Sequence, residues 1–279
     1  MAALLLLIAP APAVADTSPF FAAEQSRLQL LLAKAERRGE RAMTIAAQAQ
    51  QARRAAQSEG NREAEQIAEQ AVADAEQALA KSRAQQQRLR ERLANLERAM
   101  QAGNSAGVSL RHSGMVERMQ GGRWQQLPAG AAVGPGDELR AGRGSEAELL
   151  FADGSRVILG SDTSFRVGEL GEQRASFELL RGRIHSWFTC LKGRGQCGER
   201  LYRHRGCFGA VLGTEFVLAG SEDGVTTLSV LEGEVELHHA RRDRPVLVPA
   251  GQRASMSGDG EVVRLLPFDA NEFRAEREP

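Results

Sequence analysis

The sequence predicts an α+β protein with segregated parts: an N-terminal helical hairpin or coiled coil, followed by an all-β domain built like a solenoid or a sandwich. From Phe20 to about Met100 the chain has no Pro and only two Gly, and it is rich in Ala, Gln, Glu and Arg, which are strong helix formers. From residue 136 to residue 233, short and mostly apolar segments recur between Gly-containing turns. That second pattern is typical of β-strands.

Small apolar residues recur at three- and four-residue steps through the helical part. They are Leu28, Leu32, Ala35, Gly39, Ala42, Ala46, Ala49 and Ala56 in the first half, then Ala64, Ala68, Ala71, Ala75, Ala78, Ser82, Gln85, Leu89, Leu93, Leu96 and Met100 in the second. This spacing predicts a coiled-coil seam. Gly60 and Asn61 interrupt it, and Gly followed by Asn is a signal for one helix to end and another to be capped. We therefore expect an antiparallel hairpin, with one continuous helix in a dimer as the alternative, and we allow for a homo-oligomer through the stalk.

Two segments of the β part nearly repeat each other. Residues 177–184 align with residues 228–235 and place Gly182 over Gly233. Together with Asp153-Gly154, which supplies the positive φ of a tight turn, they predict hairpins or the rungs of a solenoid. Pro residues flank 246–248, which predicts an edge or closing strand there.

The first residues resemble a secretory signal. A short apolar run at 4–8 precedes Ala13-Val14-Ala15, which fits the small-x-small cleavage rule. A buried N-terminal helix and an uncleaved anchor are the alternatives. We divide the chain into a signal peptide at 1–15, a helical stalk at 16–101, a flexible linker at 102–107, a β domain at 108–266 and a mobile charged tail at 267–279, and we expect a periplasmic location.

Composition narrows the function. With 36 basic and 36 acidic residues the formal net charge is zero, so no overall field favours nucleic acid. No segment is apolar enough for a membrane span. None of the five histidines lies in a catalytic motif, and Ser155 follows Gly154 in what its flanks mark as a hairpin turn. We expect no enzyme activity, no cofactor and no metal.

The chain has three cysteines, Cys190, Cys197 and Cys207. Disulfides persist in an exported protein, and the short loop between Cys190 and Cys197 is easily closed by one. We expect that pairing, with Cys207 as the rival partner of Cys190. A zinc site from these cysteines and His204 is less favoured, because zinc knuckles place their cysteines closer together.

Several motifs of the β part occur in a characteristic order. They are Gly136-Asp137, the turn Asp153-Gly154-Ser155, the run Gly213-Thr214-Glu215-Phe216, the pair Glu232-Gly233 and Pro249-Ala250-Gly251. In order and spacing they resemble the periplasmic domain of the FecR family of bacterial signalling proteins, over roughly residues 108–265. Leu212 stands where the family usually has Arg, so a polar contact at that position is not carried over.

The resemblance implies a fold and a role. In the family this domain lies across a membrane from a sigma-factor-binding segment and relays contact with an outer-membrane receptor. Here a signal peptide and a coiled coil precede the domain, so we expect the binding module without its own sigma-factor-regulating segment. The expected function is an exported, non-enzymatic envelope scaffold or sensor that binds a protein partner through the β domain and the coiled coil. The alternative is a module for cell-wall glycan or peptidoglycan, which would use Trp124, Trp187 and Tyr202.

Two local expectations concern surfaces. The densest basic patch, with Tyr202 among its residues, is a candidate contact for an acidic partner; its members are Arg194, Arg200, Tyr202, Arg203 and Arg205. Glu215 lies in an otherwise apolar strand, where alternation favours an outward side chain. A partly buried Glu215 that bonds a neighbouring strand is the alternative.

Overall fold

The computed structural model describes residues 18–103, 106–171, 173–188, 198–211 and 213–271. The expected signal peptide, Cys190, Cys197 and Arg194 lie outside these ranges. Among the helices within them, none combines the length and the hydropathy that crossing a bilayer requires.

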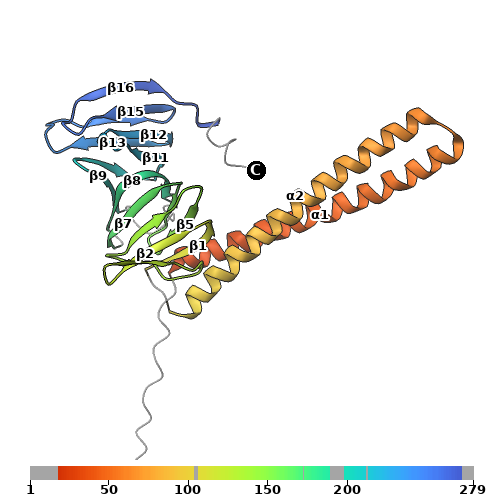
Figure 1. Cartoon of the computed structure of the whole chain (residues 1–279), viewed down its shortest axis with the longest axis horizontal. Helices are drawn as coiled ribbons and strands as arrows, with labels where there is room; N and C mark the ends of the chain where they lie inside the picture. Colours follow the sequence, from red (N-terminus) through yellow and green to blue (C-terminus); the bar gives the residue numbers. More distant parts are fainter. Residues whose placement is uncertain (1–17, 104–105, 172, 189–197, 212, 272–279) are drawn as a thin grey trace, which may run out of the picture.

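The N-terminal part is a helical hairpin, as expected. Helix α1 (Pro19–Glu59) and helix α2 (Arg62–Gln101) run antiparallel and extend away from the strands (Figure 1). Gly60 ends α1 in the left-handed conformation with φ 66°, and Asn61 caps α2 by accepting a hydrogen bond from the Ala64 amide at 3.1 Å. The Gly-Asn signal therefore gives a reversal of the chain, and the continuous-helix alternative is wrong.

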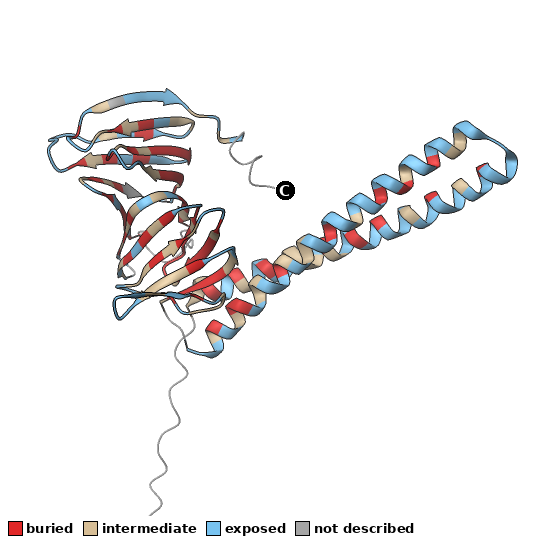
Figure 2. Ribbon diagram, in the orientation of Figure 1, coloured by how far each residue is buried: buried red, intermediate tan, exposed pale blue. Residues whose placement is uncertain are grey.

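Small side chains line the contact between the two helices, and Figure 2 shows the buried residues on their facing sides. Ala35, Ala42 and Ala49 of α1 are buried, and the Ser82 hydroxyl of α2 donates to the Ala35 carbonyl at 2.7 Å. In α2 one row of the predicted seam stays buried at seven-residue steps, namely Ala68, Ala75, Ser82, Leu89 and Leu96. The second row differs from the prediction, because Ala78 is exposed and Val72, four residues after Ala68, is buried.

The rest of the described chain forms one open sheet whose two halves, sheet A and sheet B, meet at a shared strand. In order of pairing, sheet A contains β1 (Gly107–Ser113), β5 (Glu146–Phe151), β6 (Ser155–Leu159), β8 (Arg174–Phe188), β11 (Glu215–Gly220), β12 (Thr226–Glu232), β15 (Gln252–Met256) and β16 (Val262–Pro267). Sheet B contains β3 (Arg123–Gln126), β2 (Val116–Gln120), β4 (Glu138–Ala141), β7 (Thr163–Leu170), β8 again, β9 (Glu199–His204), β10 (Cys207–Val211), β13 (Glu234–His239) and β14 (Val246–Pro249). The β8–β9 pair is parallel and the other named pairs are antiparallel.

The near-repeat marks two corners between the sheets. At Gly182, strand β8 leaves its sheet B partners and begins to pair in sheet A, and at Gly233 the chain passes from β12 in sheet A to β13 in sheet B. Both glycines have positive φ, 91° and 82°. Thr163 and Thr214 pack against them and precede them by the same number of residues. Of the two expectations for the near-repeat, hairpin turns at these two glycines are therefore wrong, while the rungs of a solenoid stay a prediction.

The turn at Asp153-Gly154 does join a hairpin, between β5 and β6, and Gly154 has φ 88°. One hydrophobic core takes side chains from both sheets, among them Phe165, Phe177 and Phe216. These observations confirm separate helical and β parts, while the choice between solenoid and sandwich stays a prediction.

The C-terminal part of the chain forms one end of each sheet, β14 in sheet B and β16 in sheet A. Strand β14 pairs with β13 at one end of the order, as expected for an edge strand. Strand β16 extends to Pro267, and the Phe268 amide donates to the Gly251 carbonyl at 2.7 Å. Ordered structure thus continues past residue 266, where the tail was expected to begin.

The corner at Gly182 generates a prediction about stability. A Cβ at this position would lie 2.6 Å from Thr163 Oγ1 and 2.7 Å from Thr163 Cα, whereas a Cβ at Gly136, with similar φ (87°), meets nothing within 4 Å. A left-handed conformation costs roughly 1–2 kcal/mol for Ala, and overpacking adds about 1–3 kcal/mol. We expect Gly182→Ala to lower the free energy of unfolding by about 3 kcal/mol and Gly136→Ala by about 1 kcal/mol, measured by urea denaturation with circular dichroism. Equal losses of stability in the two variants would contradict the close packing of Gly182 against Thr163 at the corner.

Candidate functional site

The base of the helical hairpin is docked on sheet A. Phe21 and Leu28 of α1 and Leu96 of α2 form one buried cluster with Leu110 of β1 and Leu150 of β5. Burying side chains of this size contributes about 1.5–3 kcal/mol each. The stalk and the β part are therefore joined by a packed interface, and the Gly-rich segment expected as a flexible linker does not separate them.

A buried ion network crosses this interface. The Arg156 guanidinium of β6 contacts Glu24 of α1 at 2.5 Å and Glu148 of β5 at 3.0 Å, and all three side chains are buried. Arg92 of α2 forms a second ion pair with Glu148. Removing charges from water is costly unless partners and hydrogen bonds compensate. Here the two helices and two strands each supply a partner, so the network requires the docked arrangement.

The carboxyl group of Glu148 shows the balance of these forces. Burial opposes its ionisation most strongly, but the summed attraction of Arg156, Arg92 and Arg111 exceeds that effect and lowers the pKa below the ordinary value of 4.5. Glu148 is therefore ionised in the folded protein at neutral pH.

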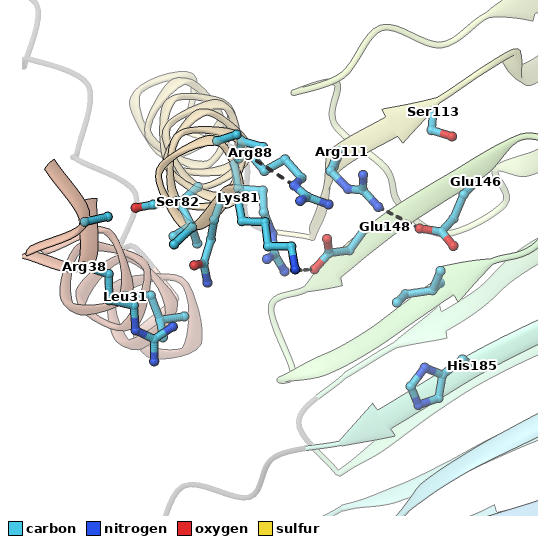
Figure 3. A pocket seen from close by; sticks show the side chains of 18 of the residues that line it. Leu31, Arg38, Lys81, Ser82, Arg88, Arg111, Ser113, Glu146, Glu148 and His185 are labelled. Atoms are coloured by element: carbon cyan, nitrogen blue, oxygen red, sulfur yellow. Dashed lines mark hydrogen bonds and ion pairs between the residues drawn. The ribbon is translucent and has the colours of Figure 1, made fainter. Parts of the chain in front are cut away.

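Beyond the docked base, the hairpin and sheet A enclose a groove of about 2060 Å³. Figure 3 shows Arg38 on α1 and Lys81, Ser82 and Arg88 on α2 along one side, with Arg111 of β1 on the sheet side. Strands β5, β6 and β8 complete the sheet side. The docked interface fixes the base of the stalk. It therefore also holds the following turns of α1 and α2 beside sheet A, and the groove lies between these turns and the sheet.

The sheet side of the groove contains a polar pair and an aromatic ring. His185 Nε2 of β8 lies 2.8 Å from Glu215 Oε1 of β11, and both side chains are largely buried. The His185 ring is 5.0 Å from the ring of Trp187, and the Arg156 guanidinium lies 5.3 Å from the centre of the same Trp187 ring. The expected outward position of Glu215 is therefore wrong, and the alternative, a partly buried Glu215 bonded to the neighbouring strand, is correct.

The motif Asp153-Gly154-Ser155 builds an internal ion pair. Asp153 accepts hydrogen bonds from the Ser155 amide at 2.9 Å and the Ser155 hydroxyl at 2.8 Å. Its Oδ2 atom also lies 2.6 Å from Arg200 Nε on β9. All of these side chains are buried. The motif thus closes the β5–β6 hairpin and ties it to β9.

Two candidate contact residues of the basic patch are internal. The Arg200 guanidinium stacks over Phe188 at 4.4 Å, and the Tyr202 hydroxyl hydrogen-bonds Ser186 at 2.6 Å. Burial raises the pKa of Tyr202, because the phenolate would lose its water, so the side chain stays neutral. Because both are 2 % exposed, Arg200 and Tyr202 cannot meet a partner, and their prediction as contact residues is wrong.

The other members of the patch differ. Arg203 and Arg205 are exposed, and Arg205 donates to the Glu222 carbonyl at 3.1 Å. Arg194 lies outside the described residues. Among the described positions, the basic patch is therefore reduced to two exposed arginines.

The other family-motif residues also lie in turns, corners and the core. Asp137, beside Gly136, accepts a hydrogen bond from the Gly134 amide at 2.9 Å. Gly213 has φ 67°, and Thr214 packs against Gly233. Phe216 is in the core, whereas Glu232 is exposed. The sequence motifs therefore mark the architecture of the domain more than its surface.

The cysteines give no metal centre in the part of the chain that the structure describes. Cys207 is buried and free of a disulfide, and burial raises the pKa of its thiol. No group of three His, Cys, Asp or Glu side chains in the described ranges is arranged to hold a metal ion. The Cys190–Cys197 disulfide falls outside those ranges and stays a prediction.

The aromatic residues of the glycan alternative do not share a surface. Tyr202 is buried, Trp187 belongs to β8 in sheet A, and Trp124 belongs to β3 in sheet B. The Arg140 guanidinium covers the Trp124 ring at 4.4 Å. A sugar platform requires several exposed rings on one face, and the described aromatics do not form one.

Fold and groove together define a sheet domain that carries a docked helical stalk. Residues 137–236 match the family model described as FecR protein. The β part of this chain therefore matches the FecR family over these residues, and the resemblance seen in its motifs is confirmed.

Two further comparisons cover about half of the chain. An uncharacterised protein of Treponema pallidum is 29% identical over 147 residues, which are 52% of this chain and 21% of that protein. This chain thus spans about a fifth of the length of that relative. Two crystal structures of a candidate anti-sigma factor from Parabacteroides distasonis match with a TM-score of 0.43 and 22% identity, over 50% of this chain and 64% of that one.

Sequence reasoning missed the ion network at the docked base. One signal was present: Glu24 lies between Phe21 and Leu28 at a step that belongs to the apolar seam of α1. A carboxylate in such a position indicates a buried partner, because a lone buried charge is too costly. The partner of Glu24, Arg156 on β6, lies far from it in the sequence, and so does Glu148 on β5, which pairs with the same Arg156.

The lowered pKa of Glu148 generates a prediction about pH. A carboxyl whose pKa is lower in the folded state contributes stability above its unfolded pKa, and that contribution is lost as pH falls through the folded value. We expect the wild-type free energy of unfolding to decrease from pH 5 to pH 3 more steeply than that of Glu148→Gln, which is the less stable protein at pH 7. Urea denaturation at each pH checks this, and parallel pH profiles would show that Glu148 is not held ionised by the interface.

The buried pair of Arg200 and Asp153 generates a second prediction. Arg200→Met removes the cation and leaves the Asp153 carboxylate buried, which costs about 3–5 kcal/mol. Arg203→Met changes the same residue type on the same strand at an exposed position, where the expected change is within about 0.5 kcal/mol. Thermal and urea denaturation of the two variants measure the difference. Similar stabilities would mean that Arg200 does not neutralise Asp153.

Proposed function

We propose that this protein is an exported, non-enzymatic FecR-domain protein of the cell envelope, which acts as a scaffold or sensor by binding a protein partner. The groove between the stalk and sheet A is the proposed binding site. The single observation that carries the proposal is that the FecR domain and the helical stalk build this groove together, through a packed and ion-paired interface.

The size and lining of the groove favour a segment of a protein chain. Sites for small molecules are usually clefts of about 300–1,000 Å³, and this groove has about 2060 Å³. Apolar side chains such as Ile45 and Ile158 alternate in its lining with charged ones such as Arg38 and Arg183. A lining of this kind suits the mixed side chains of a polypeptide.

The envelope location and the regulatory role rest on the FecR domain. The signal peptide expected at residues 1–15 would deliver the protein to the periplasm, and a homo-oligomer through the stalk is compatible with the exposed outer face of the hairpin. A cell-wall glycan module has no specific observation in its favour, because its expected aromatic residues lie on different sheets or in the core.

In-cell photocrosslinking tests the proposal. A photoreactive amino acid at Ile45, which is 52% exposed and lines the groove, is compared with one at Ile67, which is 66% exposed and lies outside the groove lining. We expect one protein adduct of discrete mass from position 45, identified by mass spectrometry, and none from position 67. Adducts of glycan alone at position 45, or the same adduct from both positions, would refute the protein-binding groove.

A further inference from the structure

We propose that the groove binds an acidic segment of the partner protein that also carries large apolar side chains. This inference rests on the proposed function and names the chemistry of the partner. It begins from five cations that line the groove: Arg38 and Arg41 on α1, Lys81 and Arg88 on α2, and Arg183 on β8. Within the described residues, none of the five forms an ion pair with a carboxylate.

The carboxylates of the groove do not offset this charge. Glu146 pairs with Arg111 at 2.8 Å, and Glu148 is held by Arg156 and Arg92. Asp74 remains, and it accepts a hydrogen bond from the Gln70 amide group at 2.9 Å. The groove therefore has a clear excess of positive charge, although the whole chain is neutral. A concave surface lined by one sign of charge concentrates its field and attracts the opposite sign.

The same surface offers apolar contacts between the cations. Ile45 is half exposed on α1, while Ile158 and Trp187 are half buried on the sheet side. Desolvated aromatic and aliphatic anchors supply most of the affinity of such interfaces, and the surrounding charges set partner choice and association rate. An acidic segment with spaced apolar side chains satisfies both sets of groups, whereas a purely anionic ligand leaves the apolar ones exposed to water.

Trp187 provides a direct readout, because the chain has two tryptophans and Trp124 lies in sheet B. In a Trp124→Phe background, the full-length protein is titrated with a capped, tryptophan-free peptide of repeated Glu-Glu-Leu triplets. Peptides of Lys-Lys-Leu and Ser-Ser-Leu triplets serve as controls. We expect a saturable change in Trp187 fluorescence with the acidic peptide alone, which weakens as salt shortens the screening length to about 10 Å at 0.1 M.

Matched charge reversals locate the binding. Arg38→Glu and Lys81→Glu change groove residues, while Arg37→Glu and Arg83→Glu change exposed neighbours outside the groove lining. Because an exposed ion pair contributes about 0.2–1 kcal/mol and reversal replaces attraction by repulsion, we expect each groove variant to bind about 5–10-fold more weakly. The two control variants should bind within about 2-fold of the background protein, the variation expected for charges outside the contact.

Each outcome decides the inference. Equal binding of the basic and acidic peptides, equal losses in groove and control variants, or a Trp187 response to anionic phospholipid vesicles in place of the acidic peptide would overturn it. Absence of any peptide response, together with a protein adduct at position 45, overturns the acidic segment and leaves the protein-binding groove intact. Absence of both refutes the proposed function as well.

Discussion

The guanidinium of Arg156 is the contact on which the rest of the arrangement depends. It lies buried between a carboxylate from the first helix and a carboxylate from β5, so it joins segments that are distant in the sequence. Hydrophobic packing around Phe21 and Leu96 brings the helices to the sheet, but apolar contacts alone tolerate sliding. The directional pairing of Arg156 with Glu24 and Glu148 fixes where the hairpin stands, and the groove is the space that this fixed position encloses.

The corners at Gly182 and Gly233 explain how a chain with few aromatic residues builds a large common core. At each corner a strand or strand pair changes sheets, so apolar side chains from both sheets meet in one cluster. Each corner needs glycine for two reasons: its φ is positive, and a Cβ there would collide with Thr163 at Gly182 or with Thr214 at Gly233. Most motifs that mark the FecR domain in the sequence therefore describe how the sheet is folded, and the groove is formed by residues outside those motifs.

Much of the fold was predictable because its signals are local. Gly60-Asn61 and the apolar seam indicate the hairpin, and Asp153-Gly154 indicates the β5–β6 turn. The corners were not predictable, because a positive-φ glycine gives the same local signal in a hairpin turn and in a strand that changes sheets. Arg200 was placed on the surface because its partner, Asp153, lies in a distant part of the chain. The candidate site could not be predicted for the same reason: its two sides meet through Arg156, and no single segment contains that contact.

The hairpin acts on its attachment as a mechanical lever. Its arms, α1 and α2, are 41 and 40 residues long, so at 1.5 Å per residue the tip stands about 60 Å from the base. A rotation of 10° at the base displaces the tip by about 10 Å, as that length implies. Tightly packed and ion-paired contacts have discrete arrangements and do not deform continuously. The docked interface at the base therefore resists a sideways force on the tip until its contacts give way together. A force on the outer end of the stalk would thus leave the groove unchanged until it exceeds a threshold, and would then change the distance between the stalk and sheet A in one step.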